Sequence, residues 1–171
     1  MALYRKVIPK IAKDVIRTLC SKQAIVVDEA HLAEAELDLA AVIVGHLDAE
    51  EAISKEAADT LVRLGMPKDK FNQMKQRFAE RRGIKIGEDG IDFLLNQLVE
   101  ALFASKNIEE IFEEDVELRR IIRECITKAL KVSEEVEQEA RSRLKNVREG
   151  TPEWDIEYPR MIAQVKRQKG L

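Results

Sequence analysis

The fold class is decided by the stretch Ile91-Asp-Phe-Leu-Leu-Asn-Gln-Leu-Val-Glu-Ala-Leu-Phe103. Its apolar residues recur at intervals of three or four positions, at Ile91, Leu94, Leu95, Leu98, Val99, Leu102 and Phe103. That spacing puts them on one face of an amphipathic α-helix, because about 3.6 residues complete a helical turn. The stretch therefore predicts a helix that buries one face against other helices.

The same periodicity extends in both directions from this stretch. Apolar stripes at helical spacing run through the segments 7–20, 32–47, 53–64, 116–130 and 136–147. The segments 24–27 and 84–86 differ, since the first is rich in β-branched residues and the second alternates. Each favours a short strand, and the two are candidates to pair, although so small a pair is marginally stable alone. We therefore predict a mainly α fold with a minor β pairing.

Local chemistry indicates where helices begin and end. Asp48 and Ser133, each followed by acidic residues, are typical of helix starts, where carboxylates face the positive end of the helix. Gly65 and Gly150 stand where a left-handed C-cap is expected. Pro159 lies inside the last apolar pattern and predicts a break there.

The two halves of the sequence resemble each other. A shift of 83 residues superposes apolar positions, for example Leu19 on Leu102, and after a four-residue insertion around Trp154 the shift becomes 87. Both halves then end on an aromatic residue, a methionine and a glycine. We predict a tandem duplication of an approximately four-helix unit, with repeats at 1–87 and 88–171 packed as one globular body about a pseudo-two-fold axis.

The closing segment of the first half reads Phe71-Asn-Gln-Met74-Lys75-Gln-Arg77-Phe78-Ala79-Glu-Arg81-Arg82-Gly83-Ile84. It resembles the ending of an uncharacterised bacterial family, catalogued as a domain of unknown function (number 507). The second half resembles it less, since Ile162 and Gln164 stand where the first half has Lys75 and Arg77. The resemblance implies a short helical chain with two tandem copies of the domain, and it implies no catalytic residues.

Composition limits the class of protein. Of the 171 residues, 45% are hydrophobic and 36% charged, which suits a folded core under a solvated surface. The net charge is −3, with 15 basic and 13 acidic residues in 1–87 but 14 and 19 in 88–171. The N-terminus lacks the apolar stretch of a signal peptide, and the longest apolar run, 39–44, is far shorter than the roughly 20 residues that span a bilayer. We expect a cytoplasmic protein outside the membrane.

Residues 23–31 resemble the second motif of helicase motors, in which an aspartate at the position of Asp28 serves magnesium. No phosphate-binding loop accompanies it, because none of the seven glycines is followed by lysine. We interpret Asp28 as a helix N-cap. Cys20 and Cys125 are too few and too isolated for a disulfide framework.

The sequence gives little support for a metal-binding site. His31 and His46 are the only histidines, and neither has a carboxylate at metal-site spacing on a clear common face. We expect His46 near a helix end, where a cation is favoured. The acidic clusters at 109–117 and 134–139 contain no Glu-x-x-His pair of the di-iron kind, so we interpret both as solvated helix faces. We expect no metal and no cofactor.

The segment 68–85 is the strongest binding candidate. Its basic residues include Lys70, Lys75, Arg77, Arg81 and Arg82. A face of this kind neutralises several phosphates when it binds nucleic acid or another polyanion. The alternative is an ordinary solvated face, since Phe71 and Phe78 are spaced like core residues and the net charge is negative. Trp154, in the inserted loop, is a candidate interaction anchor, either covering a core edge or exposed as a binding hot spot.

Our leading hypothesis is a non-enzymatic helical module that binds another protein through a helical groove or the acidic second half. It predicts an exposed apolar groove or patch. The alternative function is nucleic-acid or other polyanion binding through the basic helix 68–85. A third possibility is an enzyme whose carboxylates converge only in the folded chain. The sequence does not distinguish a monomer from a homo-oligomer.

Overall fold

The computed structural model describes residues 3–171. In chain order, the α-helices of this part are α1 (Ile8–Ser21), α2 (Leu32–Leu64), α3 (Phe71–Arg81), α4 (Glu88–Ala104), α5 (Asp115–Arg143) and α6 (Pro152–Gln168). Two short strands, β1 (Ile25–Val26) and β2 (Glu110–Ile111), form the sheet. The prediction of a mainly α fold is confirmed.

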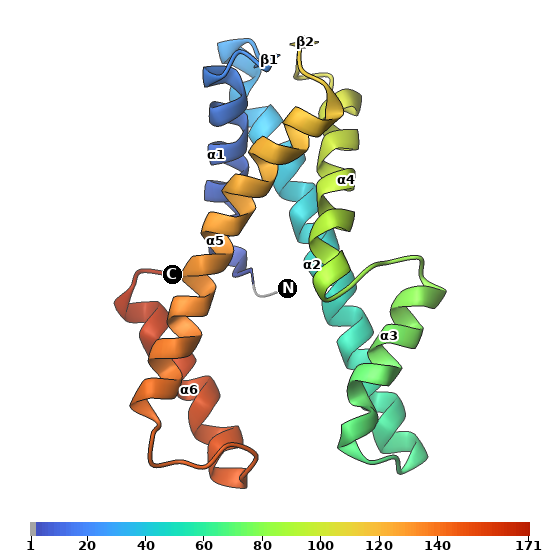
Figure 1. The fold of residues 1–171 in the computed structure, drawn as a ribbon, viewed down its shortest axis with the longest axis vertical. Coiled ribbons are helices and arrows are strands. Elements are labelled where there is room, and N and C mark those ends of the chain that lie inside the picture. Colours follow the sequence, from blue (N-terminus) through green and yellow to red (C-terminus); the bar gives the residue numbers. More distant parts are fainter. Residues whose placement is uncertain (1–2) are drawn as a thin grey trace.

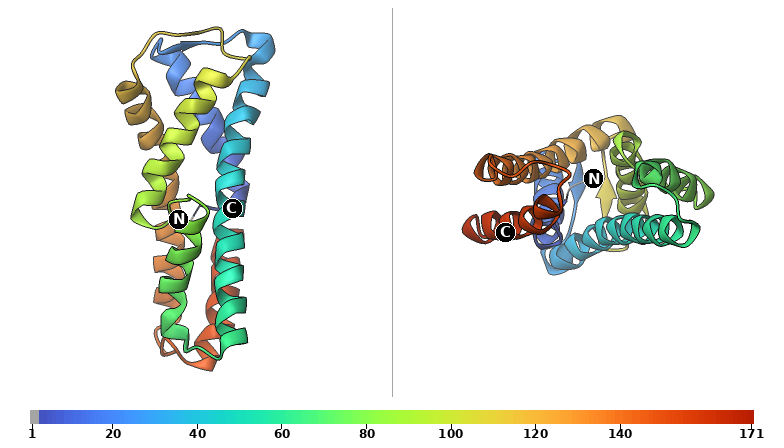
Figure 2. Two further views of the ribbon diagram at one scale, coloured as in Figure 1. Left: turned by 90° about the vertical axis from the view of Figure 1, so that its right-hand side faces the viewer. Right: turned by 90° about the horizontal axis from the view of Figure 1, so that it is seen from below.

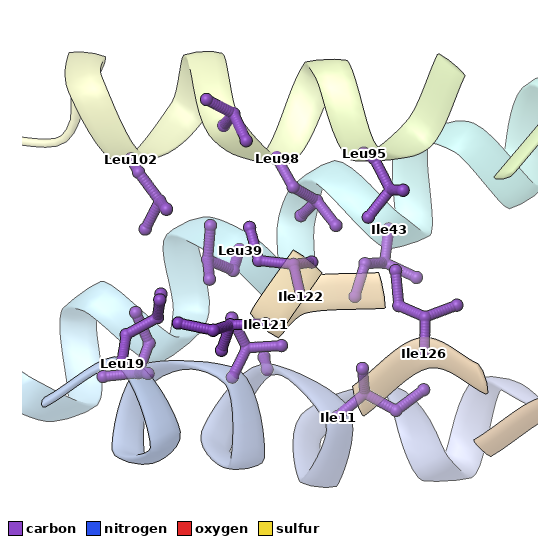
Figure 3. Packing of buried hydrophobic residues seen from close by; sticks show 14 of the residues in the cluster. Ile11, Leu19, Leu39, Ile43, Leu95, Leu98, Leu102, Ile121, Ile122 and Ile126 are labelled. Atoms are coloured by element: carbon purple, nitrogen blue, oxygen red, sulfur yellow. The ribbon is translucent and has the colours of Figure 1, made fainter. Parts of the chain in front are cut away.

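One end of the molecule is a four-helix bundle made of α1, α4 and the first halves of α2 and α5 (Figure 1). Contacts run from α1 to α2, from α2 to α4, from α4 to α5 and from α5 back to α1. The apolar stripes of all four helices meet inside the bundle. Figure 3 labels ten of these side chains, none more than 3% exposed: Ile11, Leu19, Leu39, Ile43, Leu95, Leu98, Leu102, Ile121, Ile122 and Ile126.

The other end divides into two helical hairpins, seen at the bottom of Figure 1 and end-on in Figure 2. In one, the second half of α2 packs against α3; in the other, the second half of α5 packs against α6. The α2–α3 hairpin has a core of Ile53, Ala57, Leu61, Met74, Phe78 and Ala79. The α5–α6 hairpin has a smaller buried core of Val136, Ala140 and Val165.

Helices α2 and α5 are continuous, so the predicted helix starts at Asp48 and Ser133 are wrong. The Ser133 hydroxyl donates to the Ala129 carbonyl at 3.4 Å inside α5, and the Asp48 carboxylate accepts from Arg5 at 2.6 Å. Neither side chain therefore caps a helix. Because both helices continue from the bundle into a hairpin, each half of the chain contributes three α-helices rather than about four.

The C-cap predicted at Gly65 is present, whereas the C-cap predicted at Gly150 and the break predicted at Pro159 are not. Gly65 ends α2 in the left-handed region, with φ +59°. Gly150 is also left-handed, with φ +80°, but α5 already ends at Arg143 with Leu144 as its C-cap. Helix α6 runs without interruption through Pro159. Proline removes one N–H donor from a helix, and at this exposed position water can solvate the carbonyl that loses its partner.

Strand β1 confirms the short strand expected within 24–27, but its predicted pairing with 84–86 is wrong. β1 pairs antiparallel with β2, in the register Ile25 to Ile111 and Val26 to Glu110. Ile84 and Ile86 instead pack, half-buried, against the core of the α2–α3 hairpin. The acidic segment 109–117 consequently starts as a strand and a loop, and it becomes helical only from Asp115.

The segment before α1 connects the two hairpins. Arg5 Nη2 lies 2.6 Å from an Asp48 oxygen and 2.9 Å from a Glu51 oxygen, both on α2. The ring of Tyr4 packs with the α5–α6 core, and Lys166 Nζ of α6 lies 3.6 Å from its centroid. Burial raises the pKa of the Tyr4 hydroxyl, and the negative charge of the nearby Glu137 carboxylate raises it further.

The order helix, strand, helix, helix occurs twice along the chain. A shift of 83 residues carries α1 onto 91–104 within α4, and it carries the first residue of α2 onto the first residue of α5. This agreement is what repeats at 1–87 and 88–171 would produce. The duplication itself stays a prediction.

Candidate functional site

A groove of about 490 Å³ lies between α1 and α5 on one side of the bundle. We call it the α1–α5 groove. Its floor is formed mainly by Val7, Ile11, Cys125, Ala129 and Val132, with Tyr4 and Leu171 at one end. The apolar stripes of the two helices are wider than their mutual contact, so the outer part of each stripe is left facing the groove. The chain therefore has a partly apolar groove on this side of the bundle, smaller in exposed apolar area than the several hundred Å² that the protein-binding hypothesis predicted.

The rim of the α1–α5 groove is mostly basic. Lys10, Asp14 and Arg17 lie on one exposed edge of α1, as their spacing of four and three residues requires, and Lys128 lines the α5 side. Arg17 also approaches Glu36 at 3.9 Å, a loose surface pair. Three cations against one carboxylate make the rim attractive to an anionic partner.

Cys125 is the cysteine that lines this floor. Its thiol lies 4.0 Å from the Thr18 hydroxyl across the two helices. Burial raises the pKa of Cys125, and the contact with Thr18 offsets this only in part. Burial also raises the pKa of Cys20, which lies outside the groove. Both thiols are free, and a raised pKa keeps them in the less reactive protonated form.

A second groove, of about 450 Å³, lies between α2 and α4. We call it the α2–α4 groove. Phe93, Gln97 and Glu100 line it, and each stands 83 residues after a member of the α1 rim, namely Lys10, Asp14 and Arg17. None of its lining residues is lysine or arginine. The two grooves are thus equivalent in position and opposite in charge.

His46 lies at the α2–α4 groove, but in the middle of α2 and 3% exposed, so its predicted place near a helix end is wrong. Its Nε2 is 3.6 Å from an oxygen of Glu50, one turn along the helix, so the expectation that no carboxylate shares a face with this histidine is also wrong. Burial alone raises the pKa of Glu50, but the interaction with His46 helps to bring the pKa below its usual value. Gly90 of α4 packs beside this pair, where a Cβ atom would lie 3.6 Å from the Glu50 oxygen.

Comparison with known families gives one match. The sequence matches the family described as "Protein of unknown function (DUF507)" over residues 1–171. The chain belongs to this family. The match is a single copy, so the expectation of two tandem copies of the DUF507 domain is wrong, and any internal repeat lies within one family unit. Among curated proteins the sequence has no match.

The basic residues expected to bind polyanions all lie on or beside α3 of this DUF507 chain. Lys70, Arg77, Arg81 and Arg82 are exposed, whereas Lys75 is half-buried. Arg82 is paired with Glu56 of α2 at 2.5 Å. The cationic ends of Lys75 and Arg81 lie over the rings of Phe71 and Phe78, at 5.7 and 5.6 Å from the centroids. The face is basic, but several of its cations already have partners within the hairpin.

Trp154 lies in the first turn of α6 rather than in a loop. The Thr151 hydroxyl caps that turn by accepting from the Trp154 N–H at 3.3 Å. The indole is half-buried and stacks on Tyr158, with centroids 4.9 Å apart. The Arg141 guanidinium lies over both rings, at 5.8 and 5.3 Å. Trp154 is therefore held on the surface of the α5–α6 hairpin by Tyr158 and Arg141, and its role as an interaction anchor stays a prediction.

The remaining motifs fall into structural positions. Asp28 accepts from the Ala30 N–H at 2.9 Å and so caps the short helix Glu29–His31, as interpreted from the sequence. Within residues 3–171, no group of three or more His, Cys, Asp or Glu side chains is arranged to hold a metal ion. In the same part of the chain, no helix combines the length and the apolar character needed to cross a membrane.

The α1–α5 groove was not identified from the sequence. Its two walls come from segments more than a hundred residues apart, and periodicity identifies an apolar face without identifying which part of it another helix covers. One available indication was the width of the apolar stripe in 7–20, which includes both Val7 and Ile11 near the helix start. A second was the pair of small apolar residues Cys125 and Ala129 on α5, which leave space above the floor.

Proposed function

We propose that this chain is a non-enzymatic module that binds another protein by seating a helical segment in the α1–α5 groove. The observation that supports this most is an apolar floor between α1 and α5 with a charged rim. Helix-in-groove binding uses this arrangement, in which apolar anchors enter the floor and charged residues of the partner meet the rim.

The dimensions of the groove suit such a segment. Its α1 wall extends from Val7 to Thr18, which is about 16 Å of helix or three turns. Three turns present three or four apolar anchors on one face of a bound helix. Since most of the floor residues pack against the bundle core, the floor needs little rearrangement to receive a partner.

The residues around the groove support binding rather than catalysis. The thiol of Cys125 has a raised pKa, and neither histidine lines the groove to act as its base. Asp14 is exposed on the rim rather than enclosed in a dry pocket. Catalytic groups are expected to converge and to be activated by their surroundings, and the lining of this groove offers no such pair.

Photo-crosslinking in the native host tests the proposal. A photoreactive residue at position 128 faces the groove, whereas one at position 131 lies on the same helix outside it. We expect position 128 to give a discrete adduct with another protein, which the purified chain then binds again, and position 131 to give none. Equal adducts at both positions, or no foreign protein at position 128, would contradict the proposal.

A second candidate function is binding of nucleic acid or another polyanion through α3. It is favoured by the exposure of Lys70, Arg77 and Arg81 on one hairpin. Affinity for DNA or RNA should then fall steeply with added salt, and Arg77→Ala with Arg81→Ala should reduce that dependence. Absence of binding at low salt excludes this function.

We also infer that the family unit arose by an internal duplication. The recurring order of helices and the equivalent positions of the two grooves support this inference. The copies have diverged in charge at the groove rims, so binding at the α1–α5 groove is expected to have no counterpart at the α2–α4 groove.

A further inference from the structure

We propose that the α1–α5 groove also binds a second copy of this chain, through the acidic segment 109–117 at the strand end of the bundle. We call this segment the acidic tip. The inference rests on the groove being a docking surface, as the proposed function holds, but it names a different occupant. The two bind at one place, so self-association competes with partner binding.

The acidic tip exposes apolar side chains that a folded chain usually covers. Phe112 is 61% exposed and Val116 is 76% exposed. They stand four residues apart, and the residues around them are exposed carboxylates: Glu109, Glu110, Glu113, Glu114 and Asp115. An apolar pair flanked along the chain by carboxylates complements, in charge, an apolar floor beside a mostly basic rim.

The backbone holds the tip in place. The Phe112 N–H donates to the Ala24 carbonyl at 2.8 Å, and the Glu109 N–H donates to the Val26 carbonyl at 2.9 Å. Helix α5 then begins at Asp115. Figure 1 places this segment at the end of the bundle opposite the hairpins, where another molecule can reach it. The ordering cost of binding is therefore small, because the side chains are presented from fixed backbone.

The charges that remain available favour the contact. Asp115 pairs with Arg119 at 2.9 Å and Glu117 with Arg120 at 2.5 Å, so the negative charge toward a partner comes mainly from the other four glutamates of the tip. In the groove, the lining charges are Lys10, Arg17 and Lys128 against Asp14, and Glu36 lies 3.9 Å from Arg17 just outside it. Lys106 and Lys22 near the tip, and Asp14 on the rim, weaken this attraction.

The α2–α4 groove differs from the α1–α5 groove in the charges that an acidic tip would meet. Where the α1–α5 groove has Lys10 and Arg17, the α2–α4 groove has Phe93 and Glu100. An acidic tip is attracted by the first rim and repelled by the second. The chain therefore has one binding site for the acidic tip, although it has two grooves of similar size.

The tip and the groove are different surfaces, so the contact is heterologous. Each molecule that donates its tip keeps a free groove, and association continues as an open chain unless the geometry closes a ring. A variant that lacks the tip and a variant that lacks the groove should therefore each be monomeric. Their mixture should stop at a heterodimer, because only one productive contact remains.

Sedimentation velocity of the full chain tests the proposal. The tip variant carries Phe112→Ser and Val116→Ser, the groove variant carries Lys10→Glu and Lys128→Glu, and circular dichroism verifies that both fold. The control carries Lys13→Glu and Lys131→Glu, three residues further along the same helices and outside the groove.

We expect the native chain and the control to associate with rising concentration and to dissociate in high salt. We expect each of the other variants to be monomeric and their equimolar mixture to form a dimer. A native chain that stays monomeric at high concentration and low salt overturns the inference, as does association by either variant alone. Either of these two results would leave the proposed function standing, because that function is tested separately by crosslinking to a different protein.

Discussion

Leu37 and Leu39 lie two residues apart on α2 and have opposite environments. Leu39 points into the bundle and is 1% exposed, whereas Leu37 is 67% exposed. Removing a fully buried leucine side chain leaves a cavity and typically costs about 2–5 kcal/mol. We predict that Leu39→Ala lowers the free energy of unfolding by about that amount and that Leu37→Ala changes it by less than about 0.5 kcal/mol. Urea unfolding of the two variants measures both, and equal losses would contradict the assigned core.

Glu50 gives a prediction about pH. Its pKa lies below the usual value despite burial. A carboxyl group of this kind stabilises the folded state above its unfolded pKa, and the contribution is lost as pH falls through the folded pKa. We predict that the free energy of unfolding of the native chain falls more between about pH 6 and pH 3 than that of Glu50→Gln.

Denaturant unfolding at several pH values measures this difference. Glu51→Gln is the matched control, because Glu51 is the next residue on α2 but is exposed and pairs with Arg5. Its pH profile should remain closer to that of the native chain. Parallel profiles for Glu50→Gln and the native chain would show that the carboxylate of Glu50 does not contribute in this way.

Individual residues were predicted well where chemistry is local. The left-handed Gly65 and the capping Asp28 follow from the few residues around them. His46 was misplaced because its surroundings are not local: Glu50 lies one turn along α2, but Gly90 and Phe93 come from α4. The sequence identifies a histidine on an apolar face without identifying which helix covers that face.

At the scale of elements, the two glycines of α2 should respond in opposite ways to the same substitution. Gly45 lies inside the helix, and a Cβ atom there would contact nothing within 4 Å. Gly65 has the same free space but a φ of +59°. We predict that Gly45→Ala stabilises the chain by about 0.5–1 kcal/mol, since alanine is the better helix former. Gly65→Ala should destabilise it by about 1 kcal/mol, because the backbone strain is not relieved. Thermal unfolding distinguishes the two, and a shift in the same direction for both would be inconsistent with the assigned cap.

The two hairpins should differ in local stability. The α5–α6 hairpin buries Val136, Ala140 and Val165 in its core, whereas the α2–α3 hairpin buries six apolar residues. Regions with fewer buried contacts open more readily. We predict that backbone amides of α6 exchange with deuterium faster than those of α3, although α6 is the longer helix. Slower exchange in α6 would contradict the comparison of the two cores.

Element types followed from periodicity, but element boundaries did not. The stripes in 32–47 and 53–64 are parts of one helix, because the amphipathic face continues past Asp48. Acidic residues inside a long exposed helix face look the same in sequence as those at a helix start. The partner of β1 was likewise not predictable, because a two-residue strand is too short for its hydrophobic pattern to indicate which segment it pairs with.

For the whole molecule, the bundle and the hairpins follow from how far α2 and α5 extend. Each is long enough to contribute one half to the bundle and one half to a hairpin (Figure 1). The mainly α class was therefore predictable, whereas the grooves were not. They depend on which helices become neighbours, a property of the complete packing rather than of any segment.

The central claim is that the α1–α5 groove is occupied by another protein in the cell. The two free cysteines allow this to be tested within one molecule. Cys125 lines the groove, so a bound protein would shield it from alkylation, whereas Cys20 lies outside the groove and serves as the internal reference. The measurement is the ratio of their alkylation rates, in intact native cells and in dilute purified protein. The Phe112→Ser and Val116→Ser variant is used so that self-association does not contribute. We predict that Cys125 reacts several-fold more slowly relative to Cys20 inside the cell. The same ratio in both settings would contradict the claim.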